Sequence, residues 1–242
     1  MTEIQDRESL SALQNGRLAV QGEFLWGSNY TFMVQVEHKQ TRFLAVYKPT
    51  KGERPLWDFP RASLARREVA AYQVSEALGW HFVPPTVYRK DAPMGPGSLQ
   101  QFIEHDPEYN YFSLSQVDRE RMRKVALFDL LINNADRKGS HIIFDSDGKL
   151  WLIDHGICFH RENKLRTVIW DFAGDIIPAE LCADLRRLQD SLDPGCELAT
   201  KLAGNLSPEE IAAIAARASQ LLSKGRFPDP HLNRRPYPWP PV

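Results

Sequence analysis

The spacing of apolar residues changes along the chain, from near alternation in the first part to helical spacing further on. Near alternation across Arg17–Glu37 predicts two strands separated at Gly27-Ser-Asn29, and Arg42–Tyr47 predicts a third. Pro49 is expected to end the third strand, because proline has no amide hydrogen to donate to a neighbouring strand. The first part of the chain is therefore predicted to be mainly β-structure.

The next part predicts a loop, a helix and two further strands. Lys51–Pro60 is polar and interrupted by prolines, which indicates a loop. Ala62–Leu78 has apolar residues at helical spacing and is followed by Gly79, so a helix that ends there is predicted. The two strands predicted after this helix are Val83–Tyr88 and Gly97–Ile103.

The second half of the chain is predicted to be mainly helical. Val117–Asn133 gives the clearest helix, and its broad apolar face indicates burial. Two more helices are predicted over Ala179–Leu192 and Pro208–Leu222, the second with Ser207 as its N-cap. Phe227–Val242 holds six prolines among sixteen residues and cannot form a regular element.

The order of these elements indicates an α+β fold, and 242 residues are long enough for one two-part unit or two small domains. We expect a polar leader over residues 1–15, which is a short helix or disordered, and a small, mainly β part over 16–103. A mainly helical part follows over 104–226, and a proline-rich tail over 227–242 either lies across the surface or binds a partner.

Charge and cysteine content exclude several classes of protein. Thirty basic and 31 acidic residues give a formal net charge of −1, which argues against nucleic acid as a partner. The three cysteines lack metal-type spacing, so neither a disulfide framework nor a zinc site is expected. This use of cysteine favours a reducing, cytoplasmic location. Since no stretch has the length of a membrane span, no integral membrane association is expected.

Polar residues that could take part in catalysis or metal binding lie after the buried helix and at the end of a short hairpin. Asp136 follows the helix, His141 comes five residues later, and Asp154 ends the second of two predicted strands, Ile142–Phe144 and Leu150–Ile153. A carboxylate can accept a proton, and carboxylate and imidazole groups can hold a divalent metal. The intervening Asp145-Ser-Asp-Gly148 lacks the remaining ligands of a calcium loop, and a hairpin turn is predicted for it.

This stretch resembles the catalytic core of the protein kinase-like superfamily, within it the phosphatidylinositol 3-/4-kinase-like branch. That branch has Asp-Arg-His-x-x-Asn where this chain has Asp136-Arg-Lys-Gly-Ser-His141, and Asp-Phe-Gly where it has Asp154-His-Gly156. The chain is also similar to small actinobacterial-type proteins with an Asn-Asn-Ala-Asp-Arg-Lys-Gly-x-His signature. The resemblance extends from about Gly16 to about Gly174 and implies a two-lobed fold, with a small, mainly β N-lobe that binds nucleotide and a reduced, mainly helical C-lobe.

The resemblance also implies roles for individual residues. Asp136 would accept the proton of the substrate hydroxyl, and Lys48 would bind the nucleotide phosphates with Glu68 as its partner. Asp154 and His141 would hold Mg²⁺ or Mn²⁺. His141 stands where the branch has asparagine, and it could instead bond to a phosphate or fix the loop.

Further nucleotide contacts are assigned by their order along the chain. A turn in place of a glycine-rich loop would supply Ser28 and Asn29, and the hinge that faces adenine would supply Gln101, Phe102 and Ile103. Next to Asp136, the basic residues Arg137 and Lys138 suit a phosphate or an acidic substrate, or form a solvated loop.

The leading hypothesis is an ATP-dependent phosphotransferase that acts on a hydroxyl acceptor, such as a protein side chain, a small polyol or a sugar. Nucleotidyl transfer stays open, because the fold does not specify the substrate. The first alternative is a pseudokinase that binds nucleotide as a regulatory module. The second is a metal-dependent phosphohydrolase whose ligands would be Asp136, His141, Asp154, His155 and His160.

Overall fold

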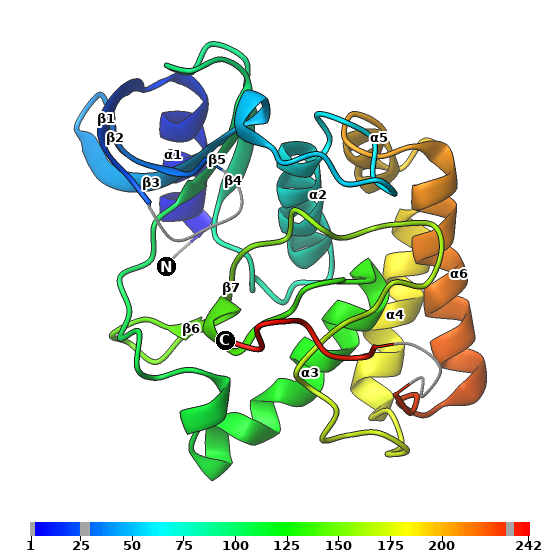
Figure 1. Ribbon diagram of the computed structural model, residues 1–242. Helices are drawn as coiled ribbons and strands as arrows, with labels where there is room; N and C mark the ends of the chain where they lie inside the picture. The colour runs from blue at the N-terminus through cyan, green and yellow to red at the C-terminus, as the bar shows by residue number, and fades with distance from the viewer. Residues whose placement is uncertain (1–2, 25–29, 231–234) are drawn as a thin grey trace.

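The computed structural model describes residues 3–24, 30–230 and 235–242. Figure 1 shows a sheet-containing N-lobe above a C-lobe made mainly of helices, with the chain crossing between them. The predicted α+β fold is confirmed, and the strands precede most of the helices, as the pattern of apolar residues indicated.

The N-lobe is built on an antiparallel sheet, which has five strands within the described residues, in the order β1-β2-β3-β5-β4. These strands are β1 (Arg17–Glu23), β2 (Phe32–His38), β3 (Thr41–Pro49), β4 (Thr86–Arg89) and β5 (Gly97–Gln101). The predicted leader forms a helix, α1 (Glu3–Asn15), which buries Ala12 and Leu13 against Val34 and Val36 of the sheet. The leader is therefore part of the N-lobe core.

The third strand continues beyond its predicted end at Tyr47. Lys48 lies opposite Ser98 of β5, and Pro49 lies opposite Gly97 at the last position of the strand. A proline is tolerated there because a strand end can dispense with one ladder hydrogen bond. Lys48 consequently projects from a fixed position on the sheet and not from a loop.

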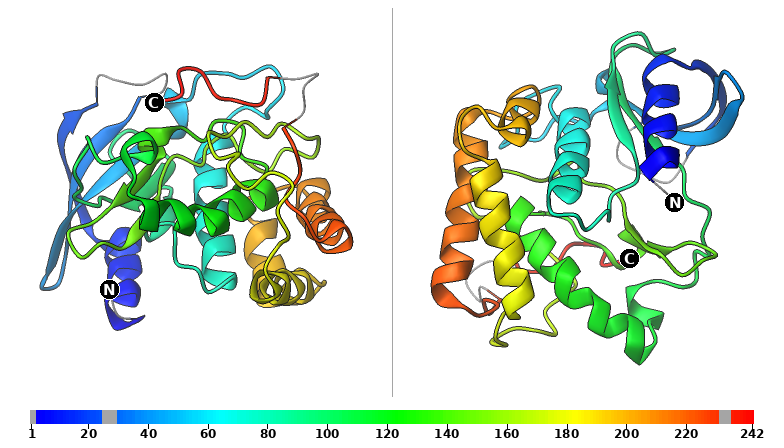
Figure 2. Two further views of the ribbon diagram at one scale, coloured as in Figure 1. Left: turned by 90° about the horizontal axis from the view of Figure 1, so that it is seen from below. Right: turned by 180° about the vertical axis from the view of Figure 1, so that it is seen from behind.

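The C-lobe contains the long buried helix and the hairpin that were predicted. Its regular elements are α3 (Gln116–Ile132), β6 (Ile142–Phe144), β7 (Leu150–Leu152), α4 (Ala179–Ser191), α5 (Glu197–Ala203) and α6 (Pro208–Lys224). Helices α4 and α6 lie side by side, as both views in Figure 2 show. The short α5 was not predicted, because seven residues after Pro194-Gly195 give too little helical periodicity.

Capping and turn residues agree with the sequence analysis. The Ser207 hydroxyl accepts a hydrogen bond from the Glu210 amide at 3.3 Å, which confirms the N-cap of α6. Asp145 accepts hydrogen bonds from the amides of Asp147 and Lys149, so the polar tetrad is a hairpin turn. Within the described part of the chain, no helix is both long and apolar enough to cross a membrane.

Helix α2 (Leu64–Ala77) joins the lobes through a buried arginine. Arg67 is 1% exposed, forms an ion pair with Glu210 of α6, and donates a hydrogen bond to the Cys158 carbonyl at 2.6 Å. Its guanidinium also lies over the ring of Phe59. Arg67 therefore fixes α2, and with it one wall of the space between the lobes, to the C-lobe.

Replacing Arg67 with alanine should lower the free energy of unfolding by about 3 kcal/mol, because Glu210 would stay buried without its counter-charge. Chemical denaturation measures this loss. The control is Arg186→Ala on the exposed face of α4, which should change stability by less than about 0.5 kcal/mol. Equal losses in the two variants would show that Arg67 does not hold the lobes together.

Candidate active site between the lobes

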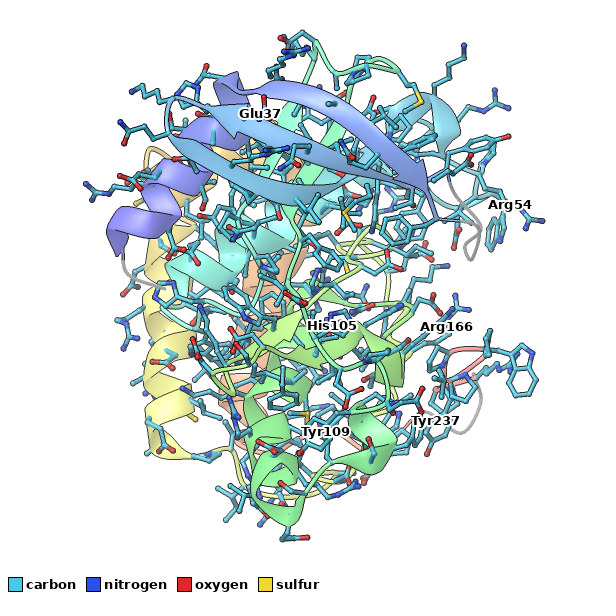
Figure 3. All side chains as sticks on the ribbon, turned by 90° about the vertical axis from the view of Figure 1, so that its left-hand side faces the viewer. Glu37, Arg54, His105, Tyr109, Arg166 and Tyr237 are labelled. Atoms are coloured by element: carbon cyan, nitrogen blue, oxygen red, sulfur yellow. The ribbon has the colours of Figure 1, made fainter. Side chains whose placement is uncertain are left out.

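A cavity of about 540 Å³ lies between the two lobes. Its walls bring together side chains that are far apart in sequence: Lys48 from β3, Glu68 from α2, and Asp136, His141 and Asp154 from the C-lobe. Figure 3 places His105, which lines the same cavity, between the sheet and α3. The five residues to which the resemblance gave catalytic or metal-binding roles thus share one cleft.

Lys48 forms two ion pairs across this cleft. Its Nζ lies 2.5 Å from Glu68 Oε1 and 2.9 Å from Asp154 Oδ1. Glu53, from the loop before α2, accepts hydrogen bonds from the amides of Leu64 and Ala65 at the start of that helix. The network therefore links the sheet, α2 and the C-lobe through one ammonium group.

The charges in this network shift one another's pKa values. Burial alone would lower the pKa of Lys48, but the carboxylates of Asp154 and Glu68 outweigh it and raise that pKa. Lys48 in turn holds the pKa of Asp154 well below its ordinary range, against the effect of burial. Burial raises the pKa of Glu68, although Lys48 opposes this shift. A charged lysine beside an ionised Asp154 suits a site that receives phosphates and a divalent cation.

The backbone at Asp154 turns sharply to present its carboxylate. Its φ of 61° lies in the left-handed region, which aspartate tolerates better than most residues. The next amide, that of His155, donates to Glu68 Oε2 at 2.9 Å, so the turn is fastened to α2. The Asp154 side chain is 51% exposed and faces the cleft.

His141 lies beside Asp154, with 3.4 Å between its Nε2 and Asp154 Oδ2. Burial lowers the pKa of His141 to about 4, so the neutral ring can offer a lone pair to a metal. The Lys138 amide donates a hydrogen bond to His141 Nδ1 at 3.4 Å, which favours the tautomer with the proton on Nε2. Binding a metal through Nε2 would require that proton to leave, and Asp154 is therefore the stronger of the two candidate ligands.

Asp136 is held at the end of α3 by two asparagines. Asn133 ends the helix in the left-handed conformation, and Asn134 Oδ1 accepts a hydrogen bond from the Asp136 amide at 3.0 Å. Burial raises the pKa of Asp136 to about 6; Lys138 opposes this shift and Asp154 adds to it. A carboxylate whose pKa is closer to neutrality is a better general base.

Arg137 does not face the cleft, so neither sequence interpretation of this residue was right. Its side chain is fully buried and lies 3.0 Å from the carboxylate of Asp129, which is also fully buried. Arg137 also donates to the Ile153 carbonyl at 3.1 Å, and Thr167 donates to Asp129 at 3.1 Å. This buried pair braces the loop on both sides of Asp136. Asp129 was missed, although a carboxylate inside an apolar helix was a visible signal.

Only some of the predicted nucleotide contacts lie within the described residues. Gln101, Phe102 and Ile103 line the cavity, while Ser28 and Asn29 fall outside the described residues. The amides of Gln101 and Phe102 donate hydrogen bonds to the Pro85 and Leu44 carbonyls and are therefore already paired.

The ligand set proposed for a phosphohydrolase is not assembled. His155 is fully buried against Arg137, with 2.8 Å between its Nε2 and an arginine nitrogen, and neither it nor His160 lines the cavity. Across the described ranges, no group of three or more His, Cys, Asp or Glu side chains is placed to hold a metal ion. Asp154 and His141 would thus hold a cation together with phosphate oxygens and water.

The two lobes and the cleft define a kinase-like fold, and solved structures agree. The crystal structure of the Golgi casein kinase with Mn/ADP bound superposes with a TM-score of 0.60, covering 92% of this chain and 76% of that chain. The two sequences are 15% identical over this match, so the likeness shows the fold alone.

Sequence comparison gives the family. The family described as phosphatidylinositol 3- and 4-kinase matches residues 36–197, and the chain belongs to it. Protein Rv2133c of Mycobacterium tuberculosis is 40% identical over 95% of this chain and 94% of its own length. Phosphatidylinositol 4-kinase gamma 4 of Arabidopsis thaliana is 30% identical over 66% of this chain, which spans only 33% of that plant relative. The resemblance found in the motif is thereby confirmed, and a kinase-like phosphotransferase is supported.

Asp136→Asn should stabilise the folded protein at pH 8, on the order of 1 kcal/mol, in the absence of metal and nucleotide. Because the pKa of Asp136 is raised above the ordinary 3.8, its charged form destabilises the fold above about pH 6, and this cost disappears on acidification. Urea denaturation at pH 8 and pH 4.5 measures the effect. The exposed Asp147→Asn serves as control, and a gain that is equal at both pH values would contradict the assignment.

Proposed function

We propose that this protein is an ATP-dependent phosphotransferase that moves the γ-phosphoryl group of ATP to a hydroxyl acceptor. The observation that carries the proposal is the meeting of Lys48, Glu68 and Asp154 in one ion-pair network, with Asp136 in the same cavity. The named activities of the plant relatives and the Mn/ADP bound to the Golgi casein kinase support nucleotide and divalent metal as its ligands.

The nucleotide would lie with its phosphates at Lys48 and its base at the segment before His105. Lys48 Nζ offers charge to the phosphates, and Glu68 keeps that ammonium group in place. The Ile103 amide is the proposed donor to adenine, and Ser28 and Asn29 remain predicted phosphate contacts. Asp154, assisted by His141, would hold Mg²⁺ or Mn²⁺, which supplies neutralisation of phosphate charge when bound.

In the transfer step, Asp136 accepts the proton of the acceptor hydroxyl. The acceptor oxygen forms a bond to the γ-phosphorus while the bond from that phosphorus to the β–γ bridging oxygen breaks, and ADP leaves with the electron pair. The raised pKa of Asp136 matches this task, since a carboxylate with a pKa of about 6 is ionised at neutral pH and still basic.

A nucleotide-binding pseudokinase is the second candidate, and His141 is the observation that favours it. In the tautomer of His141 that is protonated on Nε2, this N–H group faces Asp154. It would occupy a position where the wider superfamily offers the side-chain oxygen of asparagine as a metal ligand. Such a protein would bind nucleotide in the same cleft but would not turn it over.

Two variants separate these functions. Asp136→Asn should lower ATP turnover by roughly two orders of magnitude or more and leave nucleotide affinity nearly unchanged. Asp154→Ala should abolish the metal-dependent part of nucleotide binding, because its carboxylate serves the cleft and not the core. Turnover assays and calorimetric titration with and without Mg²⁺ measure both effects. ATP turnover at the parent rate in Asp136→Asn would remove the proposed base.

His141→Asn tests the metal ligand. If the imidazole binds the cation, the parent site should favour Mn²⁺, and the asparagine oxygen should shift the preference toward Mg²⁺. ATP turnover at matched concentrations of the two metals gives the ratio for each protein. An identical Mn²⁺/Mg²⁺ ratio in both would leave Asp154 as the only ligand named here and would assign His141 to the support of its carboxylate.

A further inference from the structure

The proline-rich residues 235–242, which we name the strap, run across the C-lobe, as the red segment of Figure 1 shows. Pro238 is buried, and Val242 lines the same cavity as Asp136 and Asp154. Figure 3 shows Tyr237 of the strap and Arg166 on the same side of the molecule. The strap is thus docked on the lobe that carries the proposed base.

Two backbone hydrogen bonds fasten the strap to the segments that flank this base. The Gly139 amide donates to the Pro241 carbonyl at 2.8 Å, and the Thr167 amide donates to the Pro236 carbonyl at 3.0 Å. Gly139 follows Asp136 by three residues, so their Cα atoms are at most about 11 Å apart. On the other side, Thr167 forms a parallel β-bridge with Arg137, the residue next to the base.

One recurring way in which an extended polypeptide binds a protein is by pairing with exposed backbone groups. Here the amides of Gly139 and Thr167 are already paired with the strap. The strap offers few donors to a further extended segment, because half of its eight residues are prolines, which have no amide hydrogen. A peptide acceptor would therefore have to displace the strap before it could align beside Asp136.

The strap leaves the cleft open to smaller molecules. With it in place, the side chain of Asp136 is 30% exposed and that of Asp154 is 51% exposed. The cavity of about 540 Å³ lies within the usual range for small-molecule sites. The strap thus forms a wall of the cavity and does not fill it.

We propose that the strap is one wall of the acceptor site and restricts the acceptor to a small molecule, excluding polypeptides. The inference rests on the proposed phosphoryl transfer and adds to it the class of acceptor. It also gives a role to the proline-rich tail. From the sequence, this tail was predicted either to lie across the surface or to bind a partner.

The test compares the full chain with Pro238→Asp, which places a charge at the buried contact of the strap. Pro194→Asp is the matched control, because it makes the same change at an exposed proline between α4 and α5. For each protein we would measure ATP consumption, transfer of labelled phosphate to dephosphorylated casein as a protein probe, and hydrogen exchange at the Gly139 and Thr167 amides. Pro238→Gly replaces Pro238→Asp if the latter does not fold.

The full chain and the control should consume ATP without labelling casein above background. Pro238→Asp should exchange both amides faster and label casein at least about tenfold more. Equal labelling by the full chain and Pro238→Asp would overturn the inference, and so would exposure of both amides without a gain in labelling. If neither the full chain nor its variants consume ATP, the proposed function itself fails. If they all consume ATP but the strap has no effect on labelling, only the inference about the strap fails.

Discussion

The double ion pair of Lys48 is the interaction on which the cleft depends. One ammonium group joins carboxylates from α2 and from the end of the hairpin, and thereby links the sheet to the C-lobe where Lys48 lines the cavity. Ion pairs that are open to water contribute little to stability, typically about 0–1 kcal/mol, and the Asp154 side chain in this network is 51% exposed. The presence of this network is therefore better explained by the chemistry of the cleft than by stability.

Burial shifts the pKa values of Asp136 and His141, two other groups of the site, in opposite directions. It raises the pKa of Asp136 to about 6 and lowers that of His141 to about 4, so at neutral pH the first is an ionised carboxylate and the second is a neutral ring. Behind them, Thr167 bonds to Asp129 through its side chain and to the strap through its amide. The brace of the catalytic loop and the proposed acceptor wall thus share one residue.

Local patterns in the sequence predicted the fold class, and helix, loop and hairpin place Asp136 and Asp154 within a short stretch that lines one cavity. The catalytic roles came from the family resemblance and stay predictions. The partner of Arg137 could not be predicted from the loop itself, because Asp129 lies eight residues earlier inside an apolar helix. The leader appeared polar because only one face of α1, with Ala12 and Leu13, is buried. Docking of the strap depends on backbone carbonyls, which every residue has and no sequence pattern reveals.

Transfer of the terminal phosphoryl group of ATP in this cleft can be tested directly by ³¹P NMR of ATP incubated with the protein and Mg²⁺. Cleavage between the β and γ phosphates should produce ADP together with inorganic phosphate, or with a new phosphomonoester when a hydroxyl acceptor is supplied. The Asp136→Asn protein should slow both products equally. Formation of AMP with pyrophosphate would show nucleotidyl transfer, and unchanged ATP would show a binding protein; either result would contradict the account.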